Sequence, residues 1–203
     1  MIHYLLPLVI SLQEPPKTSA VSPQAPVAAS TEPPLTNATP APPPPTPMDR
    51  VSWSRVVMVE KGGQHDMDAL PGSFGVTSAF ITVLMYSDFP GASAELHIKD
   101  TQPVFYVRSD ESPRGRIFLV KAERSRQGRS VKMGKSGFGS MSGMMTPDSD
   151  WTIEFTYKET AKDGVWMITP KTGLPKGEYG IYEGINSMGY PAPGGSLFDF
   201  AVE

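Results

Sequence analysis

The chain has 203 residues, among them 22 prolines and no cysteine, and its formal net charge at pH 7 is −3. The absence of cysteine excludes disulfides, thiolate catalysis and cysteine-ligated zinc or iron–sulfur centres. A general polyanion binder should be clearly basic, so the near-neutral charge argues against nucleic acid as a specific partner.

Residues 1–12 form a short segment in which most side chains are apolar. A transmembrane span needs about 20 such residues, so none is expected here. The segment is typical of the hydrophobic region of a secretory signal peptide, although no lysine or arginine precedes it. We therefore expect an extracytoplasmic protein, periplasmic or secreted, which is exported by an atypical or N-terminally truncated signal peptide. The alternative is an apolar chain end without a targeting role.

Residues 13–50 are rich in proline and poor in large apolar side chains. Proline fixes φ and removes a backbone donor, and such a segment cannot bury enough apolar surface to offset its conformational entropy. We expect a disordered Pro-rich tether with polyproline II character, which suits a stalk through a cell-envelope layer. A ligand for SH3-like domains is the alternative, because Pro42–Pro45 fits a proline motif.

From residue 51 to residue 203, apolar and polar stretches alternate and are separated by glycine turns. Asp163-Gly164 and Gly128 are hairpin signals, because these residues tolerate positive φ. No stretch of about 11 residues carries a helical apolar stripe. The pattern predicts one all-β domain with strands at Arg55–Glu60, Gly75–Tyr86, Ser93–Lys99, Val104–Arg108, Arg116–Arg124, Arg129–Met133, Thr152–Lys158, Gly164–Thr169, Glu178–Glu183 and Ser196–Val202.

Strict alternation also predicts which faces of two strands are buried. Ile153, Phe155 and Tyr157 should share one face of their strand. In the terminal strand, Phe198 and Phe200 should point into the core. Several short strands with frequent turns are typical of a sandwich or a barrel.

The segment 174–179 resembles the tyrosine corner of Greek-key sandwiches, because Leu174 and Gly177 stand five and two residues before Tyr179. In that motif the tyrosine hydroxyl bonds to backbone a few residues upstream and pins a crossover between two sheets. The resemblance implies an immunoglobulin-like or fibronectin-III-like Greek-key β-sandwich. It implies no activity, since a fold does not specify a function. An ordinary loop before a strand tyrosine is the alternative.

Residues 91–202 also resemble, as a whole, a loose group of uncharacterised exported bacterial proteins. The shared features are a strand containing Phe105-Tyr106, a glycine- and serine-rich loop at 136–143, the corner at 174–179 and a terminal Phe198-Asp199-Phe200 strand. This resemblance implies an exported β-sandwich and brings no activity with it.

His65, Asp66 and Asp68 are candidate metal ligands, because an imidazole and two carboxylates can hold a divalent ion. Calcium would suit them best, since it needs only oxygen ligands in a bent loop. His65 follows Gly62-Gly63, however, and a solvated polar turn explains the same residues. We therefore predict no metal site and no cofactor.

No catalytic residue is assigned. Gly134-Lys135-Ser136 lacks the glycine five positions earlier that a phosphate-binding loop requires. Residues 139–143 have Met141 where a Gly-x-Ser-x-Gly elbow needs its nucleophile. The loop 134–146 is rich in glycine and methionine, which is compatible with a recognition loop or with no function.

The segment from Arg108 to Lys135 carries nine basic and three acidic residues. A hairpin within it would gather basic side chains at its tip, where they can bind an anionic polymer or an acidic protein. The alternative is a solvated hairpin whose charges prevent pairing with other chains. The candidate anion- or partner-binding residues are Arg124, Arg126, Arg129 and Lys132.

Three functional hypotheses follow from these patterns. The first is an exported, non-enzymatic binding or structural module held on a proline stalk at the cell envelope. The second is an envelope-polymer hydrolase that uses loop carboxylates. The third is a polyanion-binding module that uses the Arg124–Arg129 hairpin tip.

Overall fold

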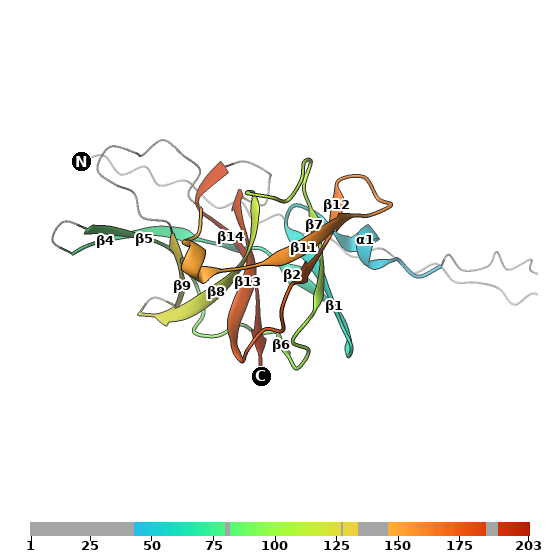
Figure 1. Ribbon diagram of the computed structural model, residues 1–203, viewed down its shortest axis with the longest axis horizontal. Coiled ribbons are helices and arrows are strands. Elements are labelled where there is room, and N and C mark those ends of the chain that lie inside the picture. Colours follow the sequence, from blue (N-terminus) through green and yellow to red (C-terminus); the bar gives the residue numbers. More distant parts are fainter. Residues whose placement is uncertain (1–42, 80–81, 127, 134–145, 186–190) are drawn as a thin grey trace, which may run out of the picture. The chain divides into compact units, whose positions relative to one another are not determined.

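The computed structural model describes residues 43–79, 82–126, 128–133, 146–185 and 191–203 (Figure 1). The apolar segment 1–12, the expected tether as far as residue 42, and the loop 134–145 lie outside the described residues. The described part is nearly all β, with 59% strand and 5% helix, which confirms the predicted class.

The described elements are α1 (Pro47–Arg50), β1 (Arg55–Glu60), β2 (Gly63–Asp68), β3 (Leu70–Pro71), β4 (Ser73–Ala79), β5 (Thr82–Phe89), β6 (His97–Ile98), β7 (Val104–Arg108), β8 (Ile117–Ser125), β9 (Gly128–Met133), the 3₁₀ turn η1 (Ser149–Trp151), β10 (Thr152–Ile153), β11 (Phe155–Glu159), β12 (Val165–Pro170), β13 (Gly177–Ile185) and β14 (Pro191–Val202). They form two sheets. One has five strands in the order β11-β12-β7-β1-β2, and neighbouring strands in it are antiparallel.

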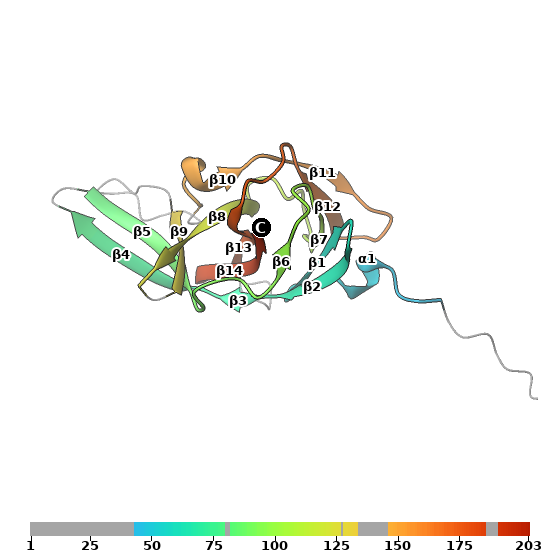
Figure 2. The ribbon, with the colours of Figure 1, turned by 90° about the horizontal axis from the view of Figure 1, so that it is seen from below.

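The second sheet has nine strands, with the order β3-β14-β13-β8-β9-β5-β4 and with β10 and β6 paired to β8 and β14. Seen from the direction of Figure 2, the strands curve around a shared interior, and one of the sheets is nearly barrel-shaped. The turns predicted at Gly128 and at Asp163-Gly164 join β8 to β9 and β11 to β12, and Gly164 has a φ of 68°.

Three predicted strands differ in extent or number from those in the structure, and one strand was predicted as a turn. The predicted strand 93–99 contains only the two-residue strand β6. The segment 63–68, interpreted as a polar turn, is strand β2, which pairs with β1 along its whole length. The predicted strand 75–86 is a hairpin of β4 and β5. The predicted strand 152–158 divides at Glu154, where the chain passes from the nine-stranded to the five-stranded sheet. Ile153 and Phe155 still contact the core between the sheets, whereas Tyr157 is 41% exposed.

Two apolar cores lie on opposite faces of the central strands β8, β13 and β14. Leu119 and Ile181 contribute to the core between the two sheets, together with Phe198 and Phe200, whose burial was predicted. Their sequence neighbours belong to a second core, which β5 and β9 help to form because the nine-stranded sheet curls over its own face. The second core consists of Phe89, Val120, Ala122, Val131, Met133, Tyr182 and Leu197.

Helix α1 packs on the outer face of the five-stranded sheet. Thr46 begins it with a capping box, in which its backbone N–H donates to the Asp49 carboxylate at 3.0 Å. Met48 packs on a small cluster that contains Val57, and Arg50 forms an ion pair with Asp66 at 3.0 Å. The folded domain therefore begins before Val51, where we expected the tether to end.

Tyr179 makes the hydrogen bond that the tyrosine corner requires. Its hydroxyl donates to the Pro175 carbonyl oxygen at 2.8 Å, and the residue is 3% exposed. Leu174 is buried, and a Cβ added at Gly177 would lie 3.3 Å from the Tyr179 hydroxyl oxygen, so the glycine leaves room for it. The motif lies where the chain passes from β12 in one sheet to β13 in the other.

We expect Tyr179→Phe to lower the free energy of unfolding by about 0.5–1.5 kcal/mol, the net contribution of one hydrogen bond. The ring keeps its stacking on Phe200, at 5.8 Å between centroids, so only the bond to Pro175 is lost. Urea titration of the two proteins measures the difference. Tyr157→Phe is the matched control, because Tyr157 is exposed. Equal urea midpoints for the wild type and both variants would contradict a stabilising role of the Tyr179 hydrogen bond.

Candidate functional site

The basic residues predicted to form one patch are separated in the structure. Arg124 and Arg126 are exposed near the end of the β8–β9 hairpin. Arg129 is 2% exposed and points inward, which corrects its assignment to an exposed tip. The Lys132 ammonium lies 3.3 Å from the Asp148 carboxylate. β9 is not an edge strand, because it pairs with β5 as well as with β8.

Arg129 is the centre of a buried ionic network. Its guanidinium forms ion pairs with Asp199 and, at 3.7 Å, with Glu178. It also donates hydrogen bonds to the carbonyl oxygens of Pro90 and Gly91, both at 3.2 Å. An arginine has several donors in a fixed plane, which makes this many-sided pairing possible. The network joins β9, β13 and β14 to the loop that follows β5.

The candidate metal ligands lie on both faces of β2. The His65 imidazole lies 3.1 Å from the Glu60 carboxylate. The carboxylates of Asp66 and Asp68 face the other way, and the second forms an ion pair with Arg55 at 2.9 Å. Among the residues that the structure describes, no group of three or more His, Cys, Asp or Glu side chains is placed to hold a metal ion.

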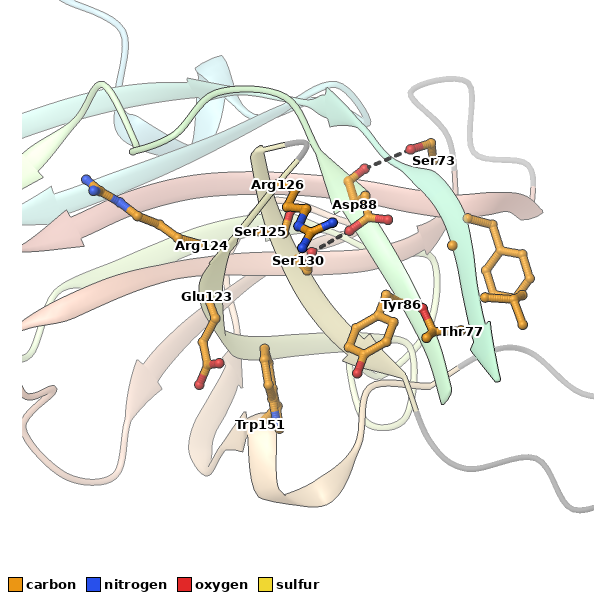
Figure 3. A pocket seen from close by; sticks show the side chains of 13 residues that line it. Ser73, Thr77, Tyr86, Asp88, Glu123, Arg124, Ser125, Arg126, Ser130 and Trp151 are labelled. Atoms are coloured by element: carbon orange, nitrogen blue, oxygen red, sulfur yellow. Dashed lines mark hydrogen bonds between the residues drawn. The ribbon is translucent and has the colours of Figure 1, made fainter. Parts of the chain in front are cut away.

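A groove crosses the outer face of the nine-stranded sheet (Figure 3). It is lined by residues of β4, β5, β8, β9 and η1, and it has a volume of about 560 Å³. That volume lies within the ordinary range of small-molecule sites, roughly 300–1,000 Å³. The polar and aromatic side chains that line it include Tyr86, Asp88, Glu123, Arg126, Ser130 and Trp151.

Asp88 is held in a fixed orientation on the groove floor. The Ser130 hydroxyl donates to its Oδ1 atom, and the Ser73 hydroxyl donates to its backbone carbonyl at 3.3 Å. A Cβ added at Gly75 would lie 2.5 Å from its Oδ2 atom, so the glycine makes space for the carboxylate. No described residue donates to Oδ2, which leaves that oxygen as an acceptor for a ligand.

The aromatic side chains of Tyr86 and Trp151 line the same groove as this carboxylate. Tyr86 comes from β5 and Trp151 from η1, both are half-buried, and Figure 3 shows them on one side of the strands. The turn that carries Trp151 is anchored, because its backbone N–H donates to the Asp148 carbonyl at 2.9 Å and β10 pairs with β8 immediately afterwards. The aromatic surfaces are therefore positioned before any ligand binds.

One carboxyl group outside the groove has a strongly shifted pKa. Glu183 is 3% exposed, and burial raises its pKa from 4.5 to about 8. In the strand pairing it lies between Ile117 and Ser196, and it does not line the groove. A carboxyl with a raised pKa can act as a general acid only where it reaches a substrate.

No protein-family model matches the chain, and no curated protein or solved structure is significantly similar to it. Within the described ranges, no helix has the length and apolar character needed to cross a membrane.

The sequence did not identify Tyr86, Asp88 and Trp151 as site residues. They belong to different strands and turns, which meet only after β4 and β5 fold back beside β9. One signal was present: in Tyr86-Ser87-Asp88-Phe89, alternation places Tyr86 and Asp88 on the face opposite the buried Phe89.

Proposed function

We propose that the protein is an exported, non-enzymatic binding module, held on a proline-rich stalk at the cell envelope, and that the groove of Figure 3 is its binding site. The observation that carries this proposal is the groove itself. It combines the aromatic rings of Phe74, Tyr86 and Trp151 with an oriented carboxylate and an exposed guanidinium on a β-sheet. Sites built on rigid strands hold their ligands more reproducibly than sites on loops.

The fold that we infer is an immunoglobulin-like Greek-key sandwich. Support comes from the strand order, because β11-β12-β7-β1 corresponds to the D-E-B-A sheet of such domains and β8-β13-β14 to the C-F-G sheet. The Tyr179 hydrogen bond then lies at the E–F corner, as it does in that fold. In this correspondence the β4–β5 hairpin is an insertion between strands A and B, and it supplies one wall of the groove.

The position of α1 also supports attachment through the preceding proline-rich segment. Figures 1 and 2 both place α1 and the β4–β5 hairpin at opposite ends of the described domain. The described chain therefore enters the domain at the end opposite the hairpin that supplies one wall of the groove.

The groove favours this proposal over the two alternatives. The predicted polyanion-binding tip is weaker than expected, because Arg129 is buried in the ionic network and Arg124 and Arg126 are the exposed arginines that remain. An envelope-polymer hydrolase needs a catalytic carboxyl with a raised pKa in a cleft. Glu183 has such a pKa but lies away from the groove.

Fractionation of cells that express the gene with its upstream region tests the proposal. We expect the protein in the envelope fraction, with a mature mass that shows cleavage near the N-terminus. When the purified proteins are added back to isolated envelopes, Tyr86→Ala/Arg126→Ala should bind less than the wild type, because two groove contacts are lost. The matched control Tyr157→Ala/Arg116→Ala removes one exposed tyrosine and one exposed arginine outside the groove and should bind like the wild type. An intact chain in the cytosol, or equal binding of both variants, would overturn the proposal.

A further inference from the structure

We infer that the ligand of the groove is a neutral oligosaccharide, an inference that rests on the proposed binding function. A sugar ring has a face of C–H groups and a rim of hydroxyl groups, so it needs an apolar surface and fixed polar groups within one site. The groove supplies the apolar surface through Tyr86 and Trp151, whose rings are rigid and lose little entropy on binding.

The polar groups of the groove match hydroxyl groups in particular. The Oδ2 atom of Asp88 needs a hydrogen-bond donor, and the Arg126 guanidinium needs an acceptor. A hydroxyl group is both donor and acceptor, so neighbouring hydroxyls on one ring can satisfy both side chains. Hydrogen bonds to charged side chains are the stronger ones, which compensates for the desolvation of a hydroxyl-rich ligand.

The charges of the groove select against ionic ligands. Asp88 and Glu123 would repel a polyanion, whereas Arg126 and Arg124 would repel a polycation. In Figure 3 the Arg124 side chain is directed away from Tyr86 and Trp151, which leaves Arg126 as the guanidinium opposed to the two carboxylates. A groove that carries charges of both signs therefore favours an uncharged ligand over a polyion of either sign.

The groove is open along the surface and crosses four strands, from β4 to β8. A chain of linked sugars can lie across such a groove and leave at either end, whereas a small metabolite would need an enclosed pocket to be desolvated. The inferred ligand is thus a segment within an oligosaccharide chain rather than a single free sugar.

A glycan array probed with the full chain tests the inference. We expect binding to neutral oligosaccharides, with an affinity that changes little between about 50 mM and 500 mM salt, because no ion pairs form with the ligand. Binding confined to anionic glycans, with a steep loss of affinity in salt, would overturn it. So would an empty array, or binding on a peptide array instead.

Calorimetry with the strongest neutral array ligand then locates the site. Trp151→Ala and Tyr86→Ala should each weaken binding about 10-fold or more, the usual effect of removing an aromatic anchor. Trp151→Phe should retain most of the affinity, which separates loss of the ring from loss of folding. Tyr157→Ala, an exposed tyrosine outside the groove, should bind like the wild type. Unchanged affinity in both alanine variants would overturn the inference.

The two tests have distinguishable failures. If the groove variant binds isolated envelopes less than the wild type while no neutral glycan binds, the binding module stands and its ligand has another chemistry. If neutral glycans bind at Trp151 but the protein stays in the cytosol, the ligand class stands and the envelope function fails.

Discussion

Arg129→Met is expected to lower the free energy of unfolding by about 3–5 kcal/mol, the usual cost of removing one partner of a buried ion pair. The substitution leaves the carboxylates of Asp199 and Glu178 without their cation, although the two are only 14% and 18% exposed. Urea denaturation of the full chain, followed by tryptophan fluorescence, measures the loss.

Arg124→Met is the matched control, because Arg124 pairs directly with Arg129 in the β8–β9 ladder but is exposed. It should change the free energy of unfolding by no more than about 0.5 kcal/mol. If Arg129→Met does not fold, Arg129→Met/Asp199→Leu should recover part of the stability, because an apolar replacement of both partners removes one unpaired charge. Equal effects at positions 124 and 129 would refute the network's role.

Glu183→Gln is expected to change how stability depends on pH. The pKa of Glu183 is about 8 in the folded protein and near 4.5 when the chain is unfolded. Between these values the unfolded chain releases the proton while the folded protein keeps it, so the wild type loses stability as pH rises. The loss levels off above pH 8. The total loss in the free energy of unfolding is at most about 5 kcal/mol, because each unit of pKa difference corresponds to about 1.4 kcal/mol.

Glutamine does not titrate, so the variant should gain stability relative to the wild type as the pH rises. Urea titrations at about pH 5, 7 and 9 measure the free energy of unfolding of both proteins. The difference between the two proteins should change with pH, and any effect of the amide that is the same at every pH does not alter that change. Glu123→Gln, an exposed site, provides the comparison and should follow the wild type. Parallel pH profiles for Glu183→Gln and the wild type would contradict a buried neutral carboxyl.

Where alternation and turn residues agreed, the sequence predicted the strands closely. β1 and β7 begin and end at the predicted residues. β2 was missed because only Met67 in it is apolar and buried, while the opposite face consists of Gln64, Asp66 and Asp68, which pair with arginines. The hairpin between β4 and β5 was missed because no glycine, proline, asparagine or aspartate occurs between Val76 and Ser87 to indicate a turn.

The site was harder to predict than the strands because it depends on which face of the second sheet is covered. Arg129 lies in a basic stretch, and arginine is usually a surface residue, yet the curl of the sheet buries it. Tyr86 and Trp151 are both in the groove, although 65 positions separate them in the sequence. Their proximity follows from the pairing of β5 with β9 and of β10 with β8, which local patterns do not report.

The burial of β14 on both faces has a consequence for the order of events during synthesis. Phe198 and Phe200 complete one core and Leu197 the other, and all three are translated after nearly every strand they contact. Neither core can close until the ribosome has passed this segment, so the domain must remain open while it is being made. Until β14 emerges, the apolar faces of β8 and β13 remain exposed, so this interval of synthesis is the one most open to aggregation.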